Sequence, residues 1–391
     1  MKKLTIGLFI DTYFPMIDGV VMVVDNYAKR LSKKANVIVF APAYKEGFND
    51  KKLPYKVVRC KCFKMPIVDY SLPTPKLDKK FLREVESYNL DIVHIHSPFT
   101  VGKVGIEYAK KHNVPLISTM HSQYKQDFLR ATNSKTLASK MTDIIMKIFE
   151  ACDECWTMNQ AISDVYTKEY GYTKTPRIIN NATDMVKIDE KEACYYINKK
   201  HEIDIDTKVF LFVGRINKLK NIFFIVDSLK VLKTLKPNFK FKMLFVGKGQ
   251  DEDELKEYID TNNMKDDIIM VGKVEERDEL AKYYRRANLF LFPSLYDSNS
   301  LVQIEAASQE TPTLFLNGSV TSAAATDNVN AFFTNNSKEE YAAKILEVMN
   351  NEKLYNKVSK NAYKDLYKNW DDVVKEAYEL YEKMINKNKG N

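Results

Sequence analysis

The sequence predicts an α/β protein built of two doubly wound domains that follow each other along the chain. Two observations predict this fold class. Short apolar runs rich in Val, Ile and aromatic residues alternate with amphipathic stretches, as strands alternate with helices in parallel sheets. This alternation restarts in the second half of the chain, whose 391 residues exceed what one hydrophobic core usually covers.

The first half supplies the elements of one domain. Its apolar runs are four to eight residues long, which is typical of buried parallel strands. We expect strands at residues 4–11, 35–42, 55–60, 91–96, 114–121, 153–158 and 177–180, and helices at 20–34, 79–89 and 101–113.

The second half repeats the pattern after a charged stretch without strands, residues 187–208. We therefore expect the boundary between about residues 185 and 207, with an N-terminal domain over 1–190 and a C-terminal domain over 191–370. Strands are expected at 208–215, 241–249, 267–274, 287–294 and 311–318, and helices near 221–235, 251–262, 276–286, 301–309 and 338–349.

The composition is that of an ordinary globular protein. Apolar residues make up 45% of the chain and charged residues 29%, which excludes a disordered or coiled-coil protein. Asp11 interrupts the first apolar run, no export signal follows, and no window is long and apolar enough for a membrane-spanning helix. We therefore expect a cytoplasmic protein that is not integral to a membrane.

The five cysteines, an odd number in a long chain, argue against a disulfide framework. Cys60 and Cys62 could join Cys152 and Cys155 in a zinc site, but about ninety residues separate the two pairs. Buried reduced thiols are the better interpretation.

Positive charge is concentrated in the first half. Residues 1–190 hold 29 of the 60 basic residues but only 21 of the 52 acidic ones. Nucleic acid, a phosphorylated substrate or an acidic membrane would explain this excess, and so would a lysine-rich solvated surface. Within residues 122–152, basic residues recur among apolar ones, as on a helix at an anionic surface or on an ordinary packed helix; they are Lys125, Arg130, Lys135, Lys140 and Lys147.

Two strand-to-helix junctions carry candidate anion-binding groups. Arg215 and Lys220, five residues apart after an expected strand, could converge on a diphosphate, or could be two solvated basic residues. Gly19 precedes a helix after the first strand, where a glycine lets backbone amides approach a phosphate. A single glycine is weak support, because neither a G-x-G-x-x-G nor a Walker sequence is present.

Three of the five histidines lie near strand ends. His94 and His96 alternate in one strand, so their side chains are expected on the same face. His121 ends another strand, where doubly wound sheets place functional groups. A buried, hydrogen-bonded histidine is the alternative interpretation for each of them.

Asp297 and Glu305 lie eight residues apart around an expected helix start. Ser300 and Gln303 fit a capping box, which starts a helix at Leu301 and leaves Asp297 in the preceding loop. The free amides of that first turn suit an anion or sugar hydroxyls, although acids there also complement the helix dipole. The acidic run at residues 251–253 is interpreted as such a first turn, and no metal site is expected from it.

In order and spacing these segments resemble the retaining glycosyltransferases of family 4, which have the GT-B fold of two facing Rossmann-like domains. The resemblance covers nearly the whole chain and is greatest for the bacterial branch that includes diacylglycerol glucosyltransferases. It rests on the Gly19 loop, on residues 91–99, 119–121, 213–221 and 271–274, and on the two acids at Asp297 and Glu305.

The resemblance implies a role for each matching residue. Arg215 and Lys220 would hold the donor diphosphate in place of a metal ion. Asp297 would lie near the sugar hydroxyls, Glu305 would accept from the ribose, and His121 would lie near the reacting side of the sugar. The resemblance also implies first-turn amides of Ser300 and Leu301 beside the sugar, backbone contacts of Gly272 and Val274 to the base, and a helix over 371–391 that crosses back to the first domain.

The implied activity is that of a hexosyltransferase. It would take a UDP-sugar as donor, need no metal or prosthetic group, and use a membrane lipid or a cell-envelope glycan as acceptor. The resemblance implies a cytoplasmic enzyme, peripheral on the inner face of an anionic membrane, with no nucleic acid partner.

Five departures from the family pattern suggest an altered donor-sugar preference. Asp297 stands where the family usually has Glu, Leu219 replaces an acid, and Glu310 replaces a glycine. Asp18 takes the place of the first of two glycines, and residues 180–184 replace a Pro-Asn-Gly segment.

Two other classes of function remain open at this point. One is a non-catalytic GT-B protein that binds a nucleotide sugar and assists an active transferase; Arg215, Lys220, Glu305 and His121 argue against it. The other is a UDP-sugar 2-epimerase. Release of UDP that depends on an acceptor separates the transferase from both.

Overall fold

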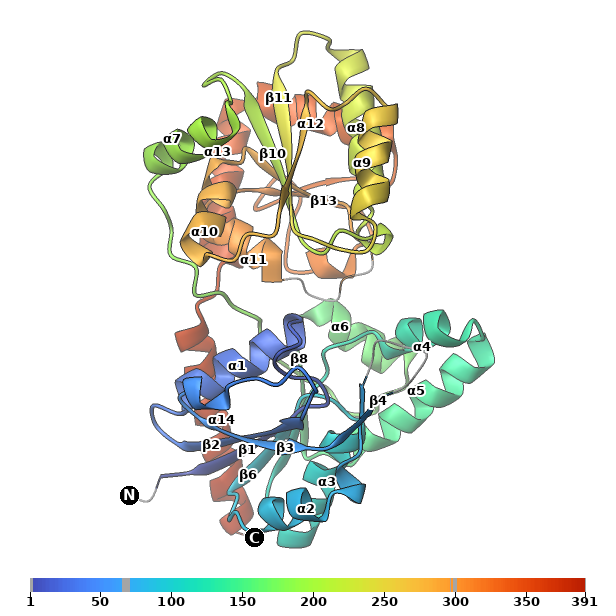
Figure 1. Cartoon of the computed structure of the whole chain (residues 1–391), viewed down its shortest axis with the longest axis vertical. Helices are drawn as coiled ribbons and strands as arrows, with labels where there is room; N and C mark the ends of the chain where they lie inside the picture. The colour runs from blue at the N-terminus through green and yellow to red at the C-terminus, as the bar shows by residue number, and fades with distance from the viewer. Residues whose placement is uncertain (1–2, 65–70, 296, 298–300, 391) are drawn as a thin grey trace. The chain divides into compact units, whose positions relative to one another are not determined.

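The computed structural model describes residues 3–64, 71–295, 297 and 301–390. The chain divides into two compact units (Figure 1). Unit 1 comprises Met1–Asn181 and Trp370–Asn391, and unit 2 comprises Ala182–Asn369.

Unit 1 contains a parallel sheet in the order β3-β2-β1-β6-β7-β8-β9, as far as its described residues show. The first strand lies between β2 and β6, so the strand order reverses at β1, as in a doubly wound fold. The strands are β1 (Thr5–Phe9), β2 (Asn36–Pro42), β3 (Lys56–Cys60), β6 (Ile92–Ile95), β7 (Leu116–Thr119), β8 (Glu154–Thr157) and β9 (Arg177–Ile178), with a separate hairpin of β4 (Cys62–Lys64) and β5 (Ser71–Pro73).

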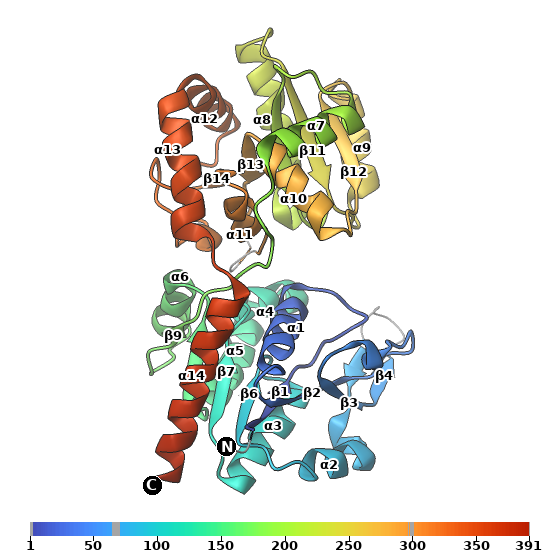
Figure 2. The ribbon, with the colours of Figure 1, turned by 90° about the vertical axis from the view of Figure 1, so that its left-hand side faces the viewer.

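The helices of unit 1 include one from the far end of the chain, α14 (Trp370–Lys389), which packs against α1 (Figures 1 and 2). Its buried residues recur every three or four positions, from Trp370 to Ile385, so one apolar stripe faces the unit. Arg30 on α1 also forms an ion pair with Asp371 at 2.8 Å. The other helices are α1 (Gly19–Leu31), α2 (Lys79–Glu86), α3 (Thr100–His112), α4 (Tyr124–Thr132), α5 (Lys135–Glu150) and α6 (Gln160–Asp164).

Unit 2 contains a second parallel sheet, in the order β12-β11-β10-β13-β14-β15 over its described residues. Here the order reverses at β10, which pairs with β11 on one side and β13 on the other. The elements are β10 (Lys208–Val213), β11 (Phe241–Val246), β12 (Ile268–Gly272), β13 (Leu289–Phe292), β14 (Thr313–Leu316), β15 (Phe332–Thr334), α7 (Glu190–His201), α8 (Ile222–Leu235), α9 (Glu252–Thr261), α10 (Arg277–Arg286), α11 (Leu301–Ser308), α12 (Lys338–Asn350) and α13 (Glu352–Asn361).

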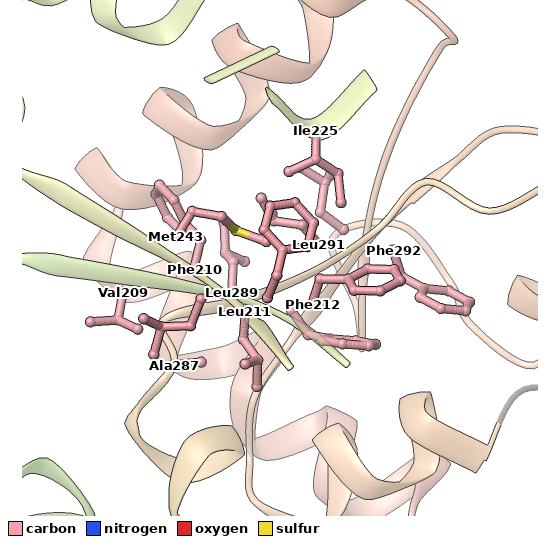
Figure 3. Packing of buried hydrophobic residues seen from close by; sticks show 14 of the residues in the cluster. Val209, Phe210, Leu211, Phe212, Ile225, Met243, Ala287, Leu289, Leu291 and Phe292 are labelled. Carbon is pink, nitrogen blue, oxygen red and sulfur yellow. The ribbon is translucent and has the colours of Figure 1, made fainter. Parts of the chain in front are cut away.

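The central strands of unit 2 are apolar at nearly every position, with Lys208 and Lys242 as exceptions, because helices cover both faces of the sheet. Residues 209–212 of β10 are fully buried. Figure 3 shows Phe210 and Phe212 of β10 beside Met243 and the β13 residues Leu289 and Leu291. This core fixes the carboxyl ends of β10 and β13 next to each other.

The chain passes from unit 1 to unit 2 between Asn181 and Ala182, earlier than the expected boundary at residue 190. The segment that follows packs against unit 2: the Ile188 amide donates to Gln309 at 2.9 Å, and Lys187 pairs with Glu310 at 2.6 Å.

The charged stretch expected to be a strand-free linker contains a helix, α7, which packs against α10. Asp189 caps it by accepting from the Glu192 amide at 3.0 Å. Only Ala193 and Ile197 are buried along α7, so its apolar stripe is too narrow to produce a clear helical pattern in the sequence.

The cysteine prediction needs one correction. Cys60, Cys152 and Cys155 are buried free thiols, whereas Cys62 and Cys194 are only half-buried.

Candidate active site

Two expected site residues meet where the strand order of unit 2 reverses. Lys220 ends the short 3-10 turn η4 (Lys218–Lys220) after β10, and Asp297 lies in the loop after β13. Their side chains form an ion pair between Nζ and Oδ1. Both are mostly buried, with side chains 17% and 13% exposed. Neighbouring loops at a switch point are the usual ligand site of such sheets.

This ion pair leaves hydrogen-bonding capacity on both partners. The second oxygen of Asp297, Oδ2, is buried and has no hydrogen-bond partner among the described residues. An ammonium group has three N–H donors, so Lys220 can hold Asp297 and still donate to an anion. A buried carboxylate oxygen without a donor is costly, which favours a ligand hydroxyl as its partner.

Arg215 lies in the same loop as Lys220 but is exposed, and it forms no ion pair or hydrogen bond with any described residue. The structure therefore does not join Arg215 to Lys220. Among the residues that the structure describes, the guanidinium has no partner.

Two glycines and an aspartate hold this loop in place. A Cβ on Gly247 would lie 1.9 Å from the Gly214 carbonyl oxygen, and one on Gly249 would lie 2.1 Å from that of Ile216. The turn after β11 therefore packs directly against the loop after β10. Asp251 adds a side-chain bond by accepting from the Lys218 amide at 2.7 Å. The acidic run at 251–253 thus has a structural role at its first residue.

We predict that Gly249→Ala destabilises unit 2 and displaces the loop that carries Lys220. The added methyl group clashes with backbone, which cannot rotate away, so a loss of about 1–3 kcal/mol in unfolding free energy is expected. Gly19→Ala is the matched control for stability, because a Cβ there meets no atom within 4 Å. Thermal unfolding of both variants checks the prediction, and equal melting temperatures would contradict it.

Glu305 is buried on α11 and both of its oxygens have partners from α10. Arg277 donates to Oε1 at 2.7 Å, and the Tyr284 hydroxyl donates to Oε2 at 2.9 Å. Arg277 is held in turn by Thr183, to whose hydroxyl it donates at 3.1 Å. Each carboxylate oxygen has further lone pairs, so Glu305 keeps the capacity to accept from a ligand hydroxyl.

Three other expected residues of unit 2, Gly272, Val274 and Leu301, lie at the carboxyl end of a strand or in the segment that follows one. Gly272 ends β12 with φ of 82°, a conformation that favours glycine, and its carbonyl accepts from the Gly247 amide at 2.8 Å. Val274 follows two residues later and is half-buried. Leu301 begins α11. Ser300, the expected helix cap, lies outside the described residues.

The remaining expected residues, Gly19 and His121, belong to unit 1. Gly19 is the first residue of α1, where Asp18 caps the helix by accepting from the Val21 amide at 2.9 Å. His121 follows β7, is buried, and lies 3.1 Å from His96 between Nε2 and Nδ1. Burial lowers the pKa of His121 to about 3, so the imidazole is neutral at physiological pH.

Glu310, which replaces the family's glycine, follows α11 in a left-handed conformation with φ of 59°. A glycine takes this conformation without strain, whereas another residue costs roughly 1–2 kcal/mol. Ion pairs with Lys187 at 2.6 Å and Arg285 at 3.1 Å offset that strain. Nothing in the structure explains Leu219, which is exposed.

Two partners of Glu305, Arg277 and Tyr284, were not predicted from the sequence, and neither was the contact between His96 and His121. Arg277 and Tyr284 are seven residues apart, so they lie on one face of α10. That spacing could have placed them together, but only the packing of α10 on α11 shows that they contact Glu305.

Within the described residues, no group of three or more His, Cys, Asp or Glu side chains is arranged to hold a metal ion. No helix in the described part of the chain is long and apolar enough to cross a membrane.

Comparison with known proteins gives family matches on both units. The model of Glycosyltransferase Family 4 matches residues 17–187, and that of Glycosyl transferases group 1 matches residues 196–365. The Alpha-monoglucosyldiacylglycerol synthase of Acholeplasma laidlawii is 27% identical over 98% of this chain and 98% of its own. The enzyme of the same name from Streptococcus pneumoniae is 23% identical over 79% of this chain and 70% of its own.

Among solved structures, Anabaena Alr3699/HepE in complex with UDP superposes with a TM-score of 0.79 at 14% identity, over 98% of this chain and 100% of its own. The two parallel-sheet units define a GT-B fold, and with the two family matches they define a hexosyltransferase. The chain belongs to the retaining glycosyltransferases of family 4, and it is similar along its length to an Alpha-monoglucosyldiacylglycerol synthase.

Proposed function

We propose that this enzyme transfers a hexosyl group, with glucose as the first candidate, from a UDP-sugar to diacylglycerol or a closely related membrane lipid. The observation that carries the donor part is the arrangement in unit 2, where Lys220 pairs with Asp297 in the loop after β13 and the buried acid Glu305 lies on α11, the next helix. The acceptor part rests on the two Alpha-monoglucosyldiacylglycerol synthases, the first of which aligns over nearly its whole length.

The donor would be held without a metal. Arg215 and Lys220 would donate to the diphosphate, and Glu305 would accept from the ribose hydroxyls while Arg277 and Tyr284 keep its carboxylate in place. The unpartnered Oδ2 of Asp297 would accept from a sugar hydroxyl. Support for UDP comes from HepE, which has been solved with UDP and glucose. We assign contacts to the base to Gly272 and Val274, and to the sugar to the first turn of α11 at Leu301.

The reaction would break the bond between the sugar C1 and the diphosphate oxygen and form a bond from C1 to the acceptor hydroxyl on the same face. The hydroxyl proton would pass to the leaving diphosphate. The chain would contribute charge stabilisation and orientation, with Lys220 and Arg215 stabilising the charge that develops on the leaving group. We also assign substrate contacts to two features of unit 1, the His121 side chain and the amides near Gly19.

The experiment is a transfer assay on the full-length protein. UDP-glucose, UDP-galactose and UDP-N-acetylglucosamine are each incubated with vesicles that contain diacylglycerol, and with vesicles that lack it. We expect equal amounts of UDP and of an α-linked glycolipid from one of these donors, only when diacylglycerol is present. Conversion of the sugar without UDP release would show an epimerase instead, and no product from any donor would overturn the proposal.

We also propose that the outer face of α5 rests on an anionic membrane. The side chains of Leu137 and Ile144 on this face are 47% and 55% exposed. Lys140 and Lys147 follow them three residues further along α5, so they lie on the same face. Exposed apolar and basic residues on one face suit the headgroup region of a bilayer. Sedimentation with anionic vesicles at low salt tests this. Binding should fall in Lys140→Glu/Lys147→Glu, and no binding by the wild type would refute the membrane contact.

A further inference from the structure

Three histidines of unit 1, His94, His96 and His121, form a buried row. His94 lies on β6 and His96 directly after it, and their rings are 4.1 Å apart between centroids. His121, after the neighbouring strand β7, continues the row with its ring 5.4 Å from that of His96. All three are nearly inaccessible to solvent.

Each histidine of the row carries one ring proton. Burial lowers the pKa of His94 and of His96 well below the usual value, and that of His121 to about 3. A neutral imidazole has one N–H donor and one lone-pair acceptor. The 3.1 Å contact between His96 Nδ1 and His121 Nε2 therefore requires one ring to donate and the other to accept.

The surroundings of His96 decide between these two arrangements. Its other nitrogen, Nε2, is buried without a hydrogen-bond partner among the described residues. If His121 donated, His96 would carry its proton on Nε2, and this N–H would be buried with no acceptor. If His96 donates from Nδ1, its Nε2 carries only a lone pair, which is left unused. Buried N–H groups without an acceptor are rarer than acceptors with spare capacity.

We infer that His96 is a positioning residue that donates from Nδ1 to His121 and so fixes His121 as the tautomer with its proton on Nδ1. The hydrogen bond that joins His121 to a described residue uses Nε2, so this tautomer leaves the Nδ1 N–H for a substrate oxygen. The opposite tautomer would offer only a lone pair, which cannot stabilise an oxygen that gains negative charge. The substrate half of this inference rests on the proposed function.

The rest of the row holds His96 in place. His94 is fixed at both nitrogens, with Nδ1 at 2.6 Å from the Tyr381 hydroxyl of α14 and Nε2 at 2.7 Å from the Thr119 hydroxyl of β7. Tyr27 of α1 packs edge-on against His96, and Trp156 of β8 packs edge-on against His94. Burial raises the pKa of Tyr27 and of Tyr381, so both hydroxyls are neutral, and Glu376 is the acid that acts on Tyr27.

The test combines nitrogen NMR of the full chain, labelled with 15N-histidine, with kinetics of three variants. The chain has five histidines, so single substitutions assign their signals. In the wild type we expect His121 to be protonated on Nδ1 and unprotonated on Nε2, unchanged between about pH 8 and 5.5. A His121 protonated on Nε2, or a mixture of both tautomers, would overturn the inference.

The variants at His96 separate positioning from packing. Asn places an amide N–H near the position of Nδ1, so His96→Asn should keep the His121 tautomer and most of kcat. His96→Leu removes the donor, so the tautomers should mix and kcat should fall about tenfold, with the affinity for UDP unchanged. His96→Asp offers an acceptor, so His121 should carry its proton on Nε2 and an acidic limb should appear in the pH profile of kcat.

Circular dichroism confirms that each variant is folded before it is scored. An unchanged His121 tautomer in folded His96→Leu, or equal losses of kcat in the Asn and Leu variants, would refute the inference. If the wild type shows the expected tautomer but transfers no sugar to any lipid, the proposed function fails and the assignment of the His96–His121 hydrogen bond stands.

Discussion

Lys220→Ala should lose about 10²–10³-fold in kcat for sugar transfer. In the proposed mechanism Lys220 stabilises the diphosphate as it leaves, and removing one such group from a preorganised site has effects of this size. The loss should appear in kcat more than in KM for the acceptor, because Lys220 acts on the donor. Steady-state transfer kinetics at saturating donor measure it.

Lys218→Ala is the matched control for this prediction. This substitution also removes one lysine charge, two residues away from Lys220. The Lys218 side chain is exposed, and its ion pair among the described residues is with Glu254. Its activity should stay within about twofold of the wild type. Because Lys220→Ala also leaves the mostly buried Asp297 without its cation, the variant must be shown to unfold above the assay temperature. Near-normal turnover of folded Lys220→Ala would refute its role at the diphosphate.

Lowering the pH from 7.5 to 5 should destabilise unit 1 by several kcal/mol. His94, His96 and His121 have folded-state pKa values below the unfolded value of about 6.5, so below that pH the unfolded chain binds more protons. Stability is then lost as the pH falls from 6.5 toward the folded pKa values, by up to about 1.4 kcal/mol per pH unit for each histidine. Buried Asp11 has a raised pKa and opposes this loss as it protonates.

Tryptophan fluorescence during urea unfolding measures the stability of unit 1, because Trp156 and Trp370 both lie in that unit. The midpoint should fall steadily between pH 6.5 and 5 in the wild type. His96→Asn removes one of the three groups, so it should reduce the slope by about a third. A midpoint that does not change with pH would show that the histidines are not held neutral.

The elements that the sequence predicted best are strands that are buried on both faces of the sheet. The central strands of unit 2 are mostly apolar because both faces of the sheet are covered, so β10 and β13 could be placed to within a few residues. Helix α7 was missed because it buries only two side chains and is otherwise charged. The short edge strand β15 and the hairpin of β4 and β5 lack the length that makes a pattern visible.

The residues of the candidate site likewise fall into those that strand order could place and those that only packing could place. Lys220 and Asp297 could be brought together by reasoning, because both follow strands that meet at a switch point. The partners of Glu305 could not, since Arg277 and Tyr284 reach it only through the packing of two helices. The hydrogen bond between His96 and His121 likewise depends on the register of two strands, which no local pattern fixes.

The donor site in unit 2 is the central claim, and calorimetric titration of UDP into the full-length protein with EDTA present tests it most directly. We predict one site per chain without added metal, with affinity at least tenfold weaker in Glu305→Gln and in Lys220→Met, and unchanged in Lys218→Ala. Each loss corresponds to about 1.4 kcal/mol or more, as expected for one charge-assisted hydrogen bond. No binding of UDP by the wild type, or equal affinity in all three variants, would contradict the account.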